Sequence, residues 1–321
     1  MVIRLISNIL FLINKYMKAE TLSKKIWFDG KVMDLADARI PLLTHSLFYG
    51  SGVFEGIRCY FTPKGPAVFR LKDHIHHLFH SAKIMGMTIP YSENDIMIAI
   101  INLIKQNNYN ECYIRPIIFY GEKMDLLPTD DTPIHFAIAT WQWGKYLPRE
   151  TVTVKVSPYI RMSSNLSDMT AKISGNYANS ILALLDAKRD GFEKALFLDE
   201  NGYIAEGAGE NIFFVKDKVL YTPNENAILS GFTRASIMRI ANDLGYEVIE
   251  KNISIDEIPT FTEAFFTGTA SEVNAISKIN EYILNNKEEG PIVKEIKLAY
   301  QHAVHGEDER YLSWLNYVAL S

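Results

Sequence analysis

The chain has 321 residues, of which 48% are hydrophobic, and a formal net charge of -5 at pH 7. A chain of this length and apolar content is too hydrophobic to be disordered and is long enough for two packed domains. Because acidic and basic residues are interspersed, no strongly charged segment indicates binding to nucleic acid or to a membrane. Small molecules are therefore the expected partners.

The first twenty residues differ from the rest of the chain. Residues 2–17 are mostly apolar, and no acidic residue precedes Glu20. The apolar run at residues 9–13 is too short to span a bilayer, and no small-residue cleavage site follows it. We expect residues 1–20 to form an N-terminal extension. Two alternatives stay open, a targeting segment and a translation start at Met17.

Residues 21–140 alternate short strand patterns with helices and predict a small α+β domain. Apolar periodicity and terminal signals predict one helix over residues 71–85 and a second over residues 92–107. Two runs rich in Ile, Tyr and Phe follow, at residues 112–120 and 134–140, and they have the composition of β-strands.

A polar and aromatic stretch at residues 141–150 has the composition of a linker between domains. Residues 151–321 predict a larger α+β domain that opens with a strand over residues 151–156. The pair Asn201-Gly202 between two apolar runs is typical of a β-hairpin. Helices are predicted over residues 177–189, 233–244 and 291–305. The fold class is therefore α+β, with two α/β domains and a site in the cleft between them.

Four histidines, His74, His76, His77 and His80, lie within the first predicted helix. His76 and His80 are four residues apart and so share one face of the helix. No third ligand lies nearby in the sequence, and no H-E-x-x-H pattern is present. We therefore expect a solvated helix face and no metal site.

Other familiar chemistries are also excluded. The sequence has no G-x-S-x-G elbow, no P-loop and no complete G-x-G-x-x-G motif after a strand. Its two cysteines, Cys59 and Cys112, lie in apolar strand-like runs, so neither a disulfide framework nor a thiolate metal site is indicated. This cysteine usage favours a reducing, cytoplasmic setting.

Lys172 lies in a run of mostly small residues, from Met169 to Tyr177, that would let a planar cofactor approach. A lysine by itself is most often a solvated surface group. The meaning of Lys172 therefore depends on the other segments of the chain.

Seven short segments resemble, in order, the motifs of branched-chain amino acid aminotransferases, which are class IV aminotransferases with the type IV fold of pyridoxal-phosphate enzymes. The first is Tyr-Gly-Ser-Gly-Val-Phe-Glu-Gly-Ile-Arg-Cys-Tyr at residues 49–60. The others lie at residues 113–116, 143–144, 172–177, 206–211, 231–234 and 268–270. Matches in the same order along most of the chain are a strong signal, whereas any one alone would be weak.

The resemblance implies that the protein binds pyridoxal 5′-phosphate and that Lys172 is the catalytic residue that forms a Schiff base with it. It also implies that Glu206 pairs with the pyridine nitrogen, that Arg58 binds the phosphate and that Tyr177 contacts the ring oxygen. The resemblance implies further cofactor contacts from Leu229, Gly231, Phe232, Thr233 and Thr269. A helix that begins at residues 231–233 would also present an anion site.

The same resemblance places the α-carboxylate of the substrate against Tyr113 and the turn Gly268-Thr269-Ala270, in which Thr269 and Ala270 are the contacts. It places the distal carboxylate of glutamate against Arg115, and an arginine within an apolar run is costly unless it meets an acid. The remaining substrate contacts are expected from Phe54, Gly56, Trp143 and Tyr146, and from Tyr49, which would reach into the site of a partner subunit.

The implied activity is reversible amino transfer between L-leucine, L-isoleucine or L-valine and 2-oxoglutarate, which yields the branched 2-oxo acids and glutamate. The implied assembly is a homodimer or a higher homo-oligomer. D-amino acid aminotransferases and aminodeoxychorismate lyases share the fold and are the alternatives, but they usually lack the Phe-Glu-Gly-Ile-Arg form found at residues 54–58.

Overall fold

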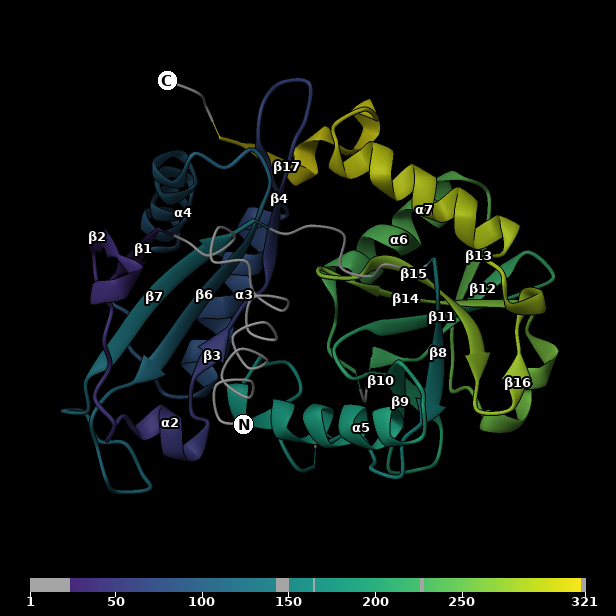
Figure 1. The fold of residues 1–321 in the computed structure, drawn as a ribbon, viewed down its shortest axis with the longest axis horizontal. Helices are drawn as coiled ribbons and strands as arrows, with labels where there is room; N and C mark the ends of the chain where they lie inside the picture. The colour runs from purple at the N-terminus through teal and green to yellow at the C-terminus, as the bar shows by residue number, and fades with distance from the viewer. Residues whose placement is uncertain (1–23, 143–149, 164, 226–227, 319–321) are drawn as a thin grey trace, which may run out of the picture.

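The computed structural model describes residues 24–142, 150–163, 165–225 and 228–318. These residues form one sheet of eight strands and one of nine, with helices packed against both. Figure 1 shows the two sheets side by side, with the C-terminal helix α7 reaching from the second sheet towards the first. No helix among the residues described is long and apolar enough to cross a membrane.

The first sheet has the strand order β17-β5-β4-β6-β7-β1-β2, and β3 pairs with β6. Its strands are β1 (Lys25–Phe28), β2 (Lys31–Asp34), β3 (Val53–Phe54), β4 (Ile57–Tyr60), β5 (Ala67–Phe69), β6 (Cys112–Tyr120), β7 (Ile134–Trp141) and β17 (Leu315–Tyr317). The helices of this part are α2 (His45–Tyr49), α3 (Leu71–Ile84) and α4 (Glu93–Asn107). Apolar side chains of α3 and α4, among them Ile75, Leu78 and Leu103, form one core with Ile114 and Ile118 of β6.

Local signals set the ends of α4. The Ser92 side chain accepts from the Asp95 backbone, and the Asp95 side chain accepts from the Ser92 backbone, so two N–H groups of the first turn are satisfied. At the other end Asn108 has φ of 56°, a left-handed conformation that asparagine tolerates. The predicted start and end of this helix are confirmed.

The second sheet has the order β10-β9-β8-β15-β14-β11-β12-β13, and β16 pairs with β15. Its strands are β8 (Thr151–Val156), β9 (Lys194–Leu198), β10 (Ile204–Gly207), β11 (Asn211–Lys216), β12 (Val219–Thr222), β13 (Glu247–Glu250), β14 (Glu263–Gly268), β15 (Glu272–Ile279) and β16 (Tyr282–Ile283). Its helices are α5 (Tyr177–Arg189), α6 (Phe232–Asp243) and α7 (Pro291–Val304). Strands β9 and β10 pair antiparallel around Asn201-Gly202, which confirms the predicted hairpin.

The two sheets share apolar packing. One core contains Tyr60 and Phe69 of the first sheet together with Phe213 and Phe265 of the second, and Tyr300 of α7 packs into the same core. The short strand β17 then pairs with β5, so the end of the chain belongs to the first sheet. The predicted larger domain, residues 151–321, includes β17, although β17 belongs to the first sheet. A pairing between such distant segments leaves no local pattern in the sequence. The division near residues 141–150 stays a prediction, and residues 143–149 and the N-terminal extension lie outside the described part.

Candidate active site

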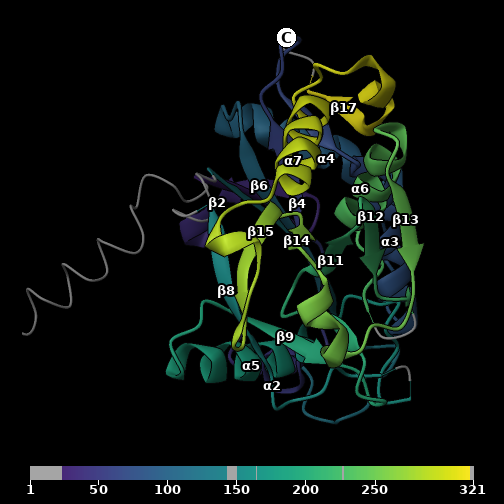
Figure 2. The same ribbon diagram turned by 90° about the vertical axis from the view of Figure 1, so that its right-hand side faces the viewer.

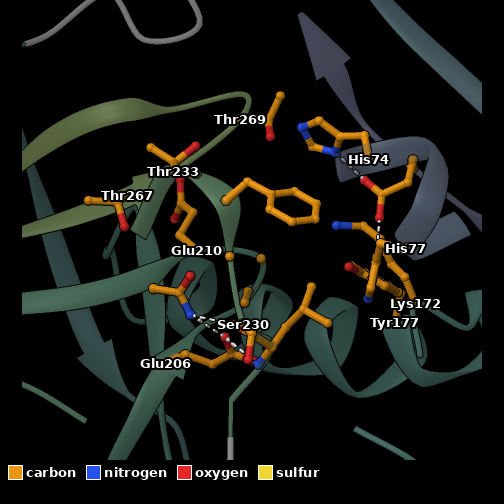
Figure 3. A pocket seen from close by; sticks show the side chains of 18 of the residues that line it. His74, His77, Lys172, Tyr177, Glu206, Glu210, Ser230, Thr233, Thr267 and Thr269 are labelled. Carbon is orange, nitrogen blue, oxygen red and sulfur yellow. Dashed lines mark hydrogen bonds and ion pairs between the residues drawn. The ribbon is translucent and has the colours of Figure 1, made fainter. Parts of the chain in front are cut away.

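A cleft lies between the segments that connect the two sheets, and it encloses about 590 Å³, part of it continuous with solvent. Eight of the nine predicted cofactor residues line it, namely Lys172, Tyr177, Glu206, Leu229, Gly231, Phe232, Thr233 and Thr269. Figure 3 shows Lys172 and Glu206 on different sides of this cleft.

The backbone of the Lys172 segment is paired with residues 50–54 of the first sheet. The Phe54 amide donates to the Lys172 carbonyl at 3.2 Å, and the Gly175 amide donates to the Gly50 carbonyl at 2.9 Å. On the other side, the Lys172 amide donates to Ser81 Oγ of α3 at 3.0 Å. Two motifs that are over 100 residues apart in the sequence therefore fix the position of the lysine together.

The Lys172 amine lies among aromatic and acidic groups. Its Nζ is 5.7 Å from the centre of the Phe54 ring, and that ring is 5.0 Å from the ring of Tyr177. Burial opposes the charge on the amine, but the electrostatic influence of Tyr177 and Glu55 raises the pKa of Lys172 above its ordinary value. These neighbours therefore favour the protonated form of the Lys172 amine.

Glu206 provides a buried carboxylate in the same cleft. Its Oε1 accepts from Arg161 Nε at 2.7 Å, its Oε2 accepts from Asn211 Nδ2 at 3.0 Å, and the Leu229 amide donates to it at 3.3 Å. Burial raises the pKa of Glu206, and the nearby Arg161 guanidinium opposes this shift. The sequence does not predict the role of Arg161, which belongs to no motif, whereas Asn211 ends the matching segment at residues 206–211.

The start of α6 lines the cleft. Gly231 precedes the helix in an extended conformation, and Phe232 and Thr233 are its first residues. Free N–H groups and the helix dipole favour a negative ligand there. Thr269, in the turn between β14 and β15, also lines this part of the cleft. The neighbouring Thr267 Oγ1 lines it too, and it is buried without a hydrogen-bond partner among the described residues.

The predicted contact between Arg58 and the phosphate stays a prediction, and in the structure Arg58 is paired within the chain. Arg58 Nη1 donates to Glu272 Oε1 at 2.6 Å, and the guanidinium lies 4.6 Å from the centre of the Tyr60 ring. Arg58 is absent from the lining of the cleft among the residues described. A buried guanidinium pairs with the nearest carboxylate, and Glu272 is 214 residues away in the sequence, so no local pattern identifies it.

Four of the predicted substrate residues lie together beside Lys172. Arg115 Nη2 donates to the Tyr113 hydroxyl at 3.3 Å, and the guanidinium is 4.8 Å from the centre of the Phe54 ring. A Cβ on Gly56 would lie 2.0 Å from the Tyr113 hydroxyl, so only glycine fits there. Tyr113 and Arg115 share one face of β6, as their spacing predicts.

The predicted contact of Arg115 with the distal carboxylate of glutamate stays a prediction, and in the structure Arg115 is stacked on aromatic side chains. Within the described ranges its guanidinium lies over aromatic rings, and its buried Nε has no hydrogen-bond partner.

The predicted contacts from Trp143 and Tyr146 lie outside the described residues. Tyr49 lies apart from the cleft, on the exposed face of α2, where its hydroxyl donates to the Met124 carbonyl. Ala270 lies beside Thr269 in the turn before β15.

The histidines of α3 form only in part the solvated face that the sequence predicts. His74 is 3% exposed, and both His74 and His77 donate to the carboxylate of Glu55 and line the cleft. His76 and His80 are exposed, as predicted. For His74 and His77 the prediction is wrong, because their side of the helix turns towards a buried acid from another segment. No group of three or more His, Cys, Asp or Glu in the described ranges could hold a metal ion.

The cleft therefore contains the groups that pyridoxal 5′-phosphate requires. A lysine amine, a buried carboxylate, a helix N-terminus with threonine hydroxyls and an unpartnered buried hydroxyl are brought into one cavity. Lys172, Glu206, Thr233 and Thr269 would hold the aldehyde carbon, the ring nitrogen and the phosphate. The residues present fit this cofactor.

Comparisons with known proteins agree with this description. The family model for amino-transferase class IV matches residues 52–279. A branched-chain-amino-acid aminotransferase of Pseudomonas aeruginosa is 43% identical over 293 residues, which cover 90% of this chain and 95% of that protein. The enzyme of that name from Escherichia coli K12 is 38% identical over 299 residues, which cover 91% of this chain and 97% of that protein.

Solved structures show the same fold. A branched-chain amino acid aminotransferase from T.th., complexed with N-(5′-phosphopyridoxyl)-L-glutamate, matches with a TM-score of 0.89 and 41% identity, over 92% of this chain and 99% of that chain. An Escherichia coli branched-chain amino acid aminotransferase structure matches with a TM-score of 0.90 and 38% identity, over 92% of this chain and 100% of that chain. The predicted α+β fold class is confirmed.

Proposed function

Because this chain belongs to the class IV aminotransferase family, we propose that it catalyses reversible amino transfer between L-leucine, L-isoleucine or L-valine and 2-oxoglutarate. The observation that carries this proposal is the single cleft that contains Lys172, Glu206 and the start of α6. The relatives named above are branched-chain aminotransferases, so a D-amino acid aminotransferase or an aminodeoxychorismate lyase is not favoured.

Pyridoxal 5′-phosphate, when bound, supplies an aldehyde carbon for the lysine amine and a conjugated ring that accepts the electron pair released at the substrate Cα. Lys172 would then move the proton at Cα, since its amine lines the cleft. Glu206 would hold a positive charge at the ring nitrogen, and Arg161 and Asn211 would keep its carboxylate oriented. The N–H groups at the start of α6 and the hydroxyls of Thr233 and Thr269 would bind the phosphate.

The substrate side chain would lie against Phe54 and Arg115, which lie together in the structure. Phe54 offers an apolar surface to a branched side chain, and Arg115 offers a cation to the distal carboxylate of glutamate. One subsite can therefore accept both substrates if the arginine stays stacked on its aromatic neighbours when no acid is present. Tyr113 and the turn that contains Thr269 and Ala270 would contact the α-carboxylate.

We also propose that the protein forms a homodimer or a higher homo-oligomer. Figure 2 shows α2 and α5 at the same end of the molecule, opposite α7. Large apolar side chains are exposed on these helices and on the nearby loop, namely Leu47, Phe48, Tyr49, Leu126, Leu127, Ile181, Leu182 and Leu185. Exposed apolar surface of this extent is typical of a protein interface.

A cytoplasmic location is proposed as well, since Cys59 and Cys112 face each other across β4 and β6 as free thiols.

The test is a panel of L- and D-amino acids, each assayed with 2-oxoglutarate while the absorption of the bound cofactor is recorded. We expect turnover with L-leucine, L-isoleucine and L-valine and none with D-alanine. Turnover with D-amino acids alone, or release of pyruvate from aminodeoxychorismate without an amino acceptor, would contradict the proposal. Analytical ultracentrifugation of the same preparation tests the oligomer, and a monomer at micromolar concentration would contradict that part.

A further inference from the structure

Glu55 is a buried acid in the cleft that also contains Lys172. Its side chain is 2% exposed, and it follows β3 in the segment that pairs with the Lys172 backbone. One carboxylate oxygen accepts from His74 Nδ1 at 2.8 Å and from the Gly56 amide at 3.2 Å. The other accepts from His77 Nδ1 at 2.6 Å. Although burial opposes ionisation, Lys172 and the two histidines hold the pKa of Glu55 well below its usual range. Glu55 is therefore an ionised acceptor.

His77 lies between two groups that can only accept hydrogen bonds. Its Nδ1 faces the Glu55 carboxylate, and its Nε2 is 2.9 Å from the carbonyl oxygen of Thr170. A carboxylate and a carbonyl carry no hydrogen of their own, so both bonds form together only when both ring nitrogens carry a proton.

The Thr170 carbonyl belongs to the segment that carries Lys172. The same face of α3 holds this segment at two more points. His80 Nε2 lies 2.9 Å from Thr170 Oγ1, and Ser81 Oγ accepts from the Lys172 amide at 3.0 Å. His80 and Ser81 follow His77 by three and four residues, which places all three along one face of the helix. Of these groups, His77 alone also contacts the acid beside the lysine amine.

We propose that His77 is a positioning residue for Lys172: as an imidazolium it joins Glu55 to the Thr170 carbonyl, fixes the Lys172 segment against α3 and offsets the charge of Glu55 next to the lysine nitrogen. This inference rests on the proposed function for its kinetic consequence. Its structural part, the fixed segment, does not depend on which substrate is used.

Several titratable groups surround His77. Its own helix contributes His74 and His80, the segment before β4 contributes Glu55, and the clamped segment contributes Lys172 and Asp168, which accepts from Thr170. Helix α6 contributes the Phe232 ring at 5.9 Å, which carries no charge. Among these groups Glu55 is the charge that His77 directly neutralises.

The test compares His77→Gln, His77→Arg and His76→Gln in the cofactor-loaded protein. Glutamine carries no positive charge and can replace only part of the two hydrogen bonds that His77 makes with Glu55 and the Thr170 carbonyl. Arginine keeps a permanent charge and several donors, and it has room because His77 borders two cavities. His76 is the matched control, since it lies on the same helix with 76% of its side chain exposed.

Three measurements report on the proposal. Without the imidazolium, the Glu55 charge stabilises the protonated lysine nitrogen, so the pH midpoint of the cofactor absorption change should rise by about one unit in His77→Gln. Amide hydrogen exchange of residues 168–175 should become about tenfold faster, as expected for the loss of one hydrogen bond. We expect kcat to fall about tenfold with little change in KM, because the lysine and not the substrate site is displaced.

His77→Arg should restore the midpoint and the slow exchange, and His76→Gln should match the wild type. A folded His77→Gln protein with wild-type midpoint and exchange would overturn the proposal. If His77→Gln does not fold, fast exchange at residues 168–175 in a folded His77→Arg protein would overturn it instead. Absence of amino transfer by the wild type would contradict only the proposed function, since hydrogen exchange still tests the clamp.

Discussion

Gly50 and Gly175 lie backbone against backbone, and this contact brings the Lys172 segment to the first sheet. The Gly175 amide donates to the Gly50 carbonyl at 2.9 Å, and a Cβ on Gly50 would lie 2.7 Å from Gly175 Cα. Gly50 also has φ of 63°, a conformation that side chains rarely adopt. The chain therefore needs glycine here for two separate reasons, one conformational and one steric.

A comparison of Gly50→Ala with Gly191→Ala should distinguish the steric cost of a side chain at Gly50 from the conformational cost. Gly191 has φ of 82° with nothing within 4 Å of a Cβ, so alanine there meets only the conformational cost, about 1–2 kcal/mol. Gly50→Ala should lower the free energy of unfolding by roughly 2–4 kcal/mol, since overlap adds to that cost. It should also weaken cofactor retention. Denaturant titration measures both variants, and equal losses would contradict the steric argument.

Lys172→Ala should abolish amino transfer while the fold is kept. The lysine backbone makes the contacts with Phe54 and Ser81, and these remain in the variant. Only the amine that the cofactor needs is removed. Lys188→Ala, at an exposed position near the end of α5, is the control and should behave as wild type. Near-normal turnover by Lys172→Ala, with circular dichroism unchanged, would exclude Lys172 as the catalytic residue.

Arg115→Ala should discriminate between the two amino acids that the enzyme is proposed to accept. The glutamate half reaction should lose roughly 2–4 kcal/mol of transition-state binding, because a distal carboxylate loses its partner. The leucine half reaction should lose much less, since Phe54 still provides the apolar contact. Single-turnover kinetics with each amino acid measures this difference. Equal losses for leucine and glutamate would show instead that Arg115 is structural, through its stacking on Phe54 and Tyr113.

Glu55→Gln should make the free energy of unfolding less dependent on pH in the acidic range. The pKa of Glu55 is lowered in the folded protein, so its ionised form stabilises the fold at pH above about 4.3, the ordinary value of a glutamate. This stabilisation is lost as the pH falls below that value. The variant should lose roughly 2–4 kcal/mol at pH 7, and less at acidic pH.

Urea denaturation at several pH values checks this expectation. Glu281→Gln, at an exposed position after β15, serves as the control and should change stability little. A loss that is the same at pH 7 and at pH 3 would show that Glu55 acts by packing alone.

Local patterns in the sequence determined much of the secondary structure. The capping pair Ser92 and Asp95, the turn at Asn201-Gly202 and the start of α6 at Phe232 all depend on neighbours within a few residues. Caps, turns and apolar periodicity act over this range, so the sequence predicts them directly. The resemblance to known aminotransferases further identified Lys172, Glu206 and Thr233, which the structure brings into one cleft.

Only the tertiary structure decided which distant groups meet. Arg58 pairs with Glu272, His77 pairs with Glu55, and β17 pairs with β5. In each case a buried charge or a strand edge takes the partner that the folded chain places beside it, and that partner leaves no mark in the local pattern. For this reason the sequence predicts a solvated face for the histidines of α3, although the folded chain turns His74 and His77 towards the buried Glu55.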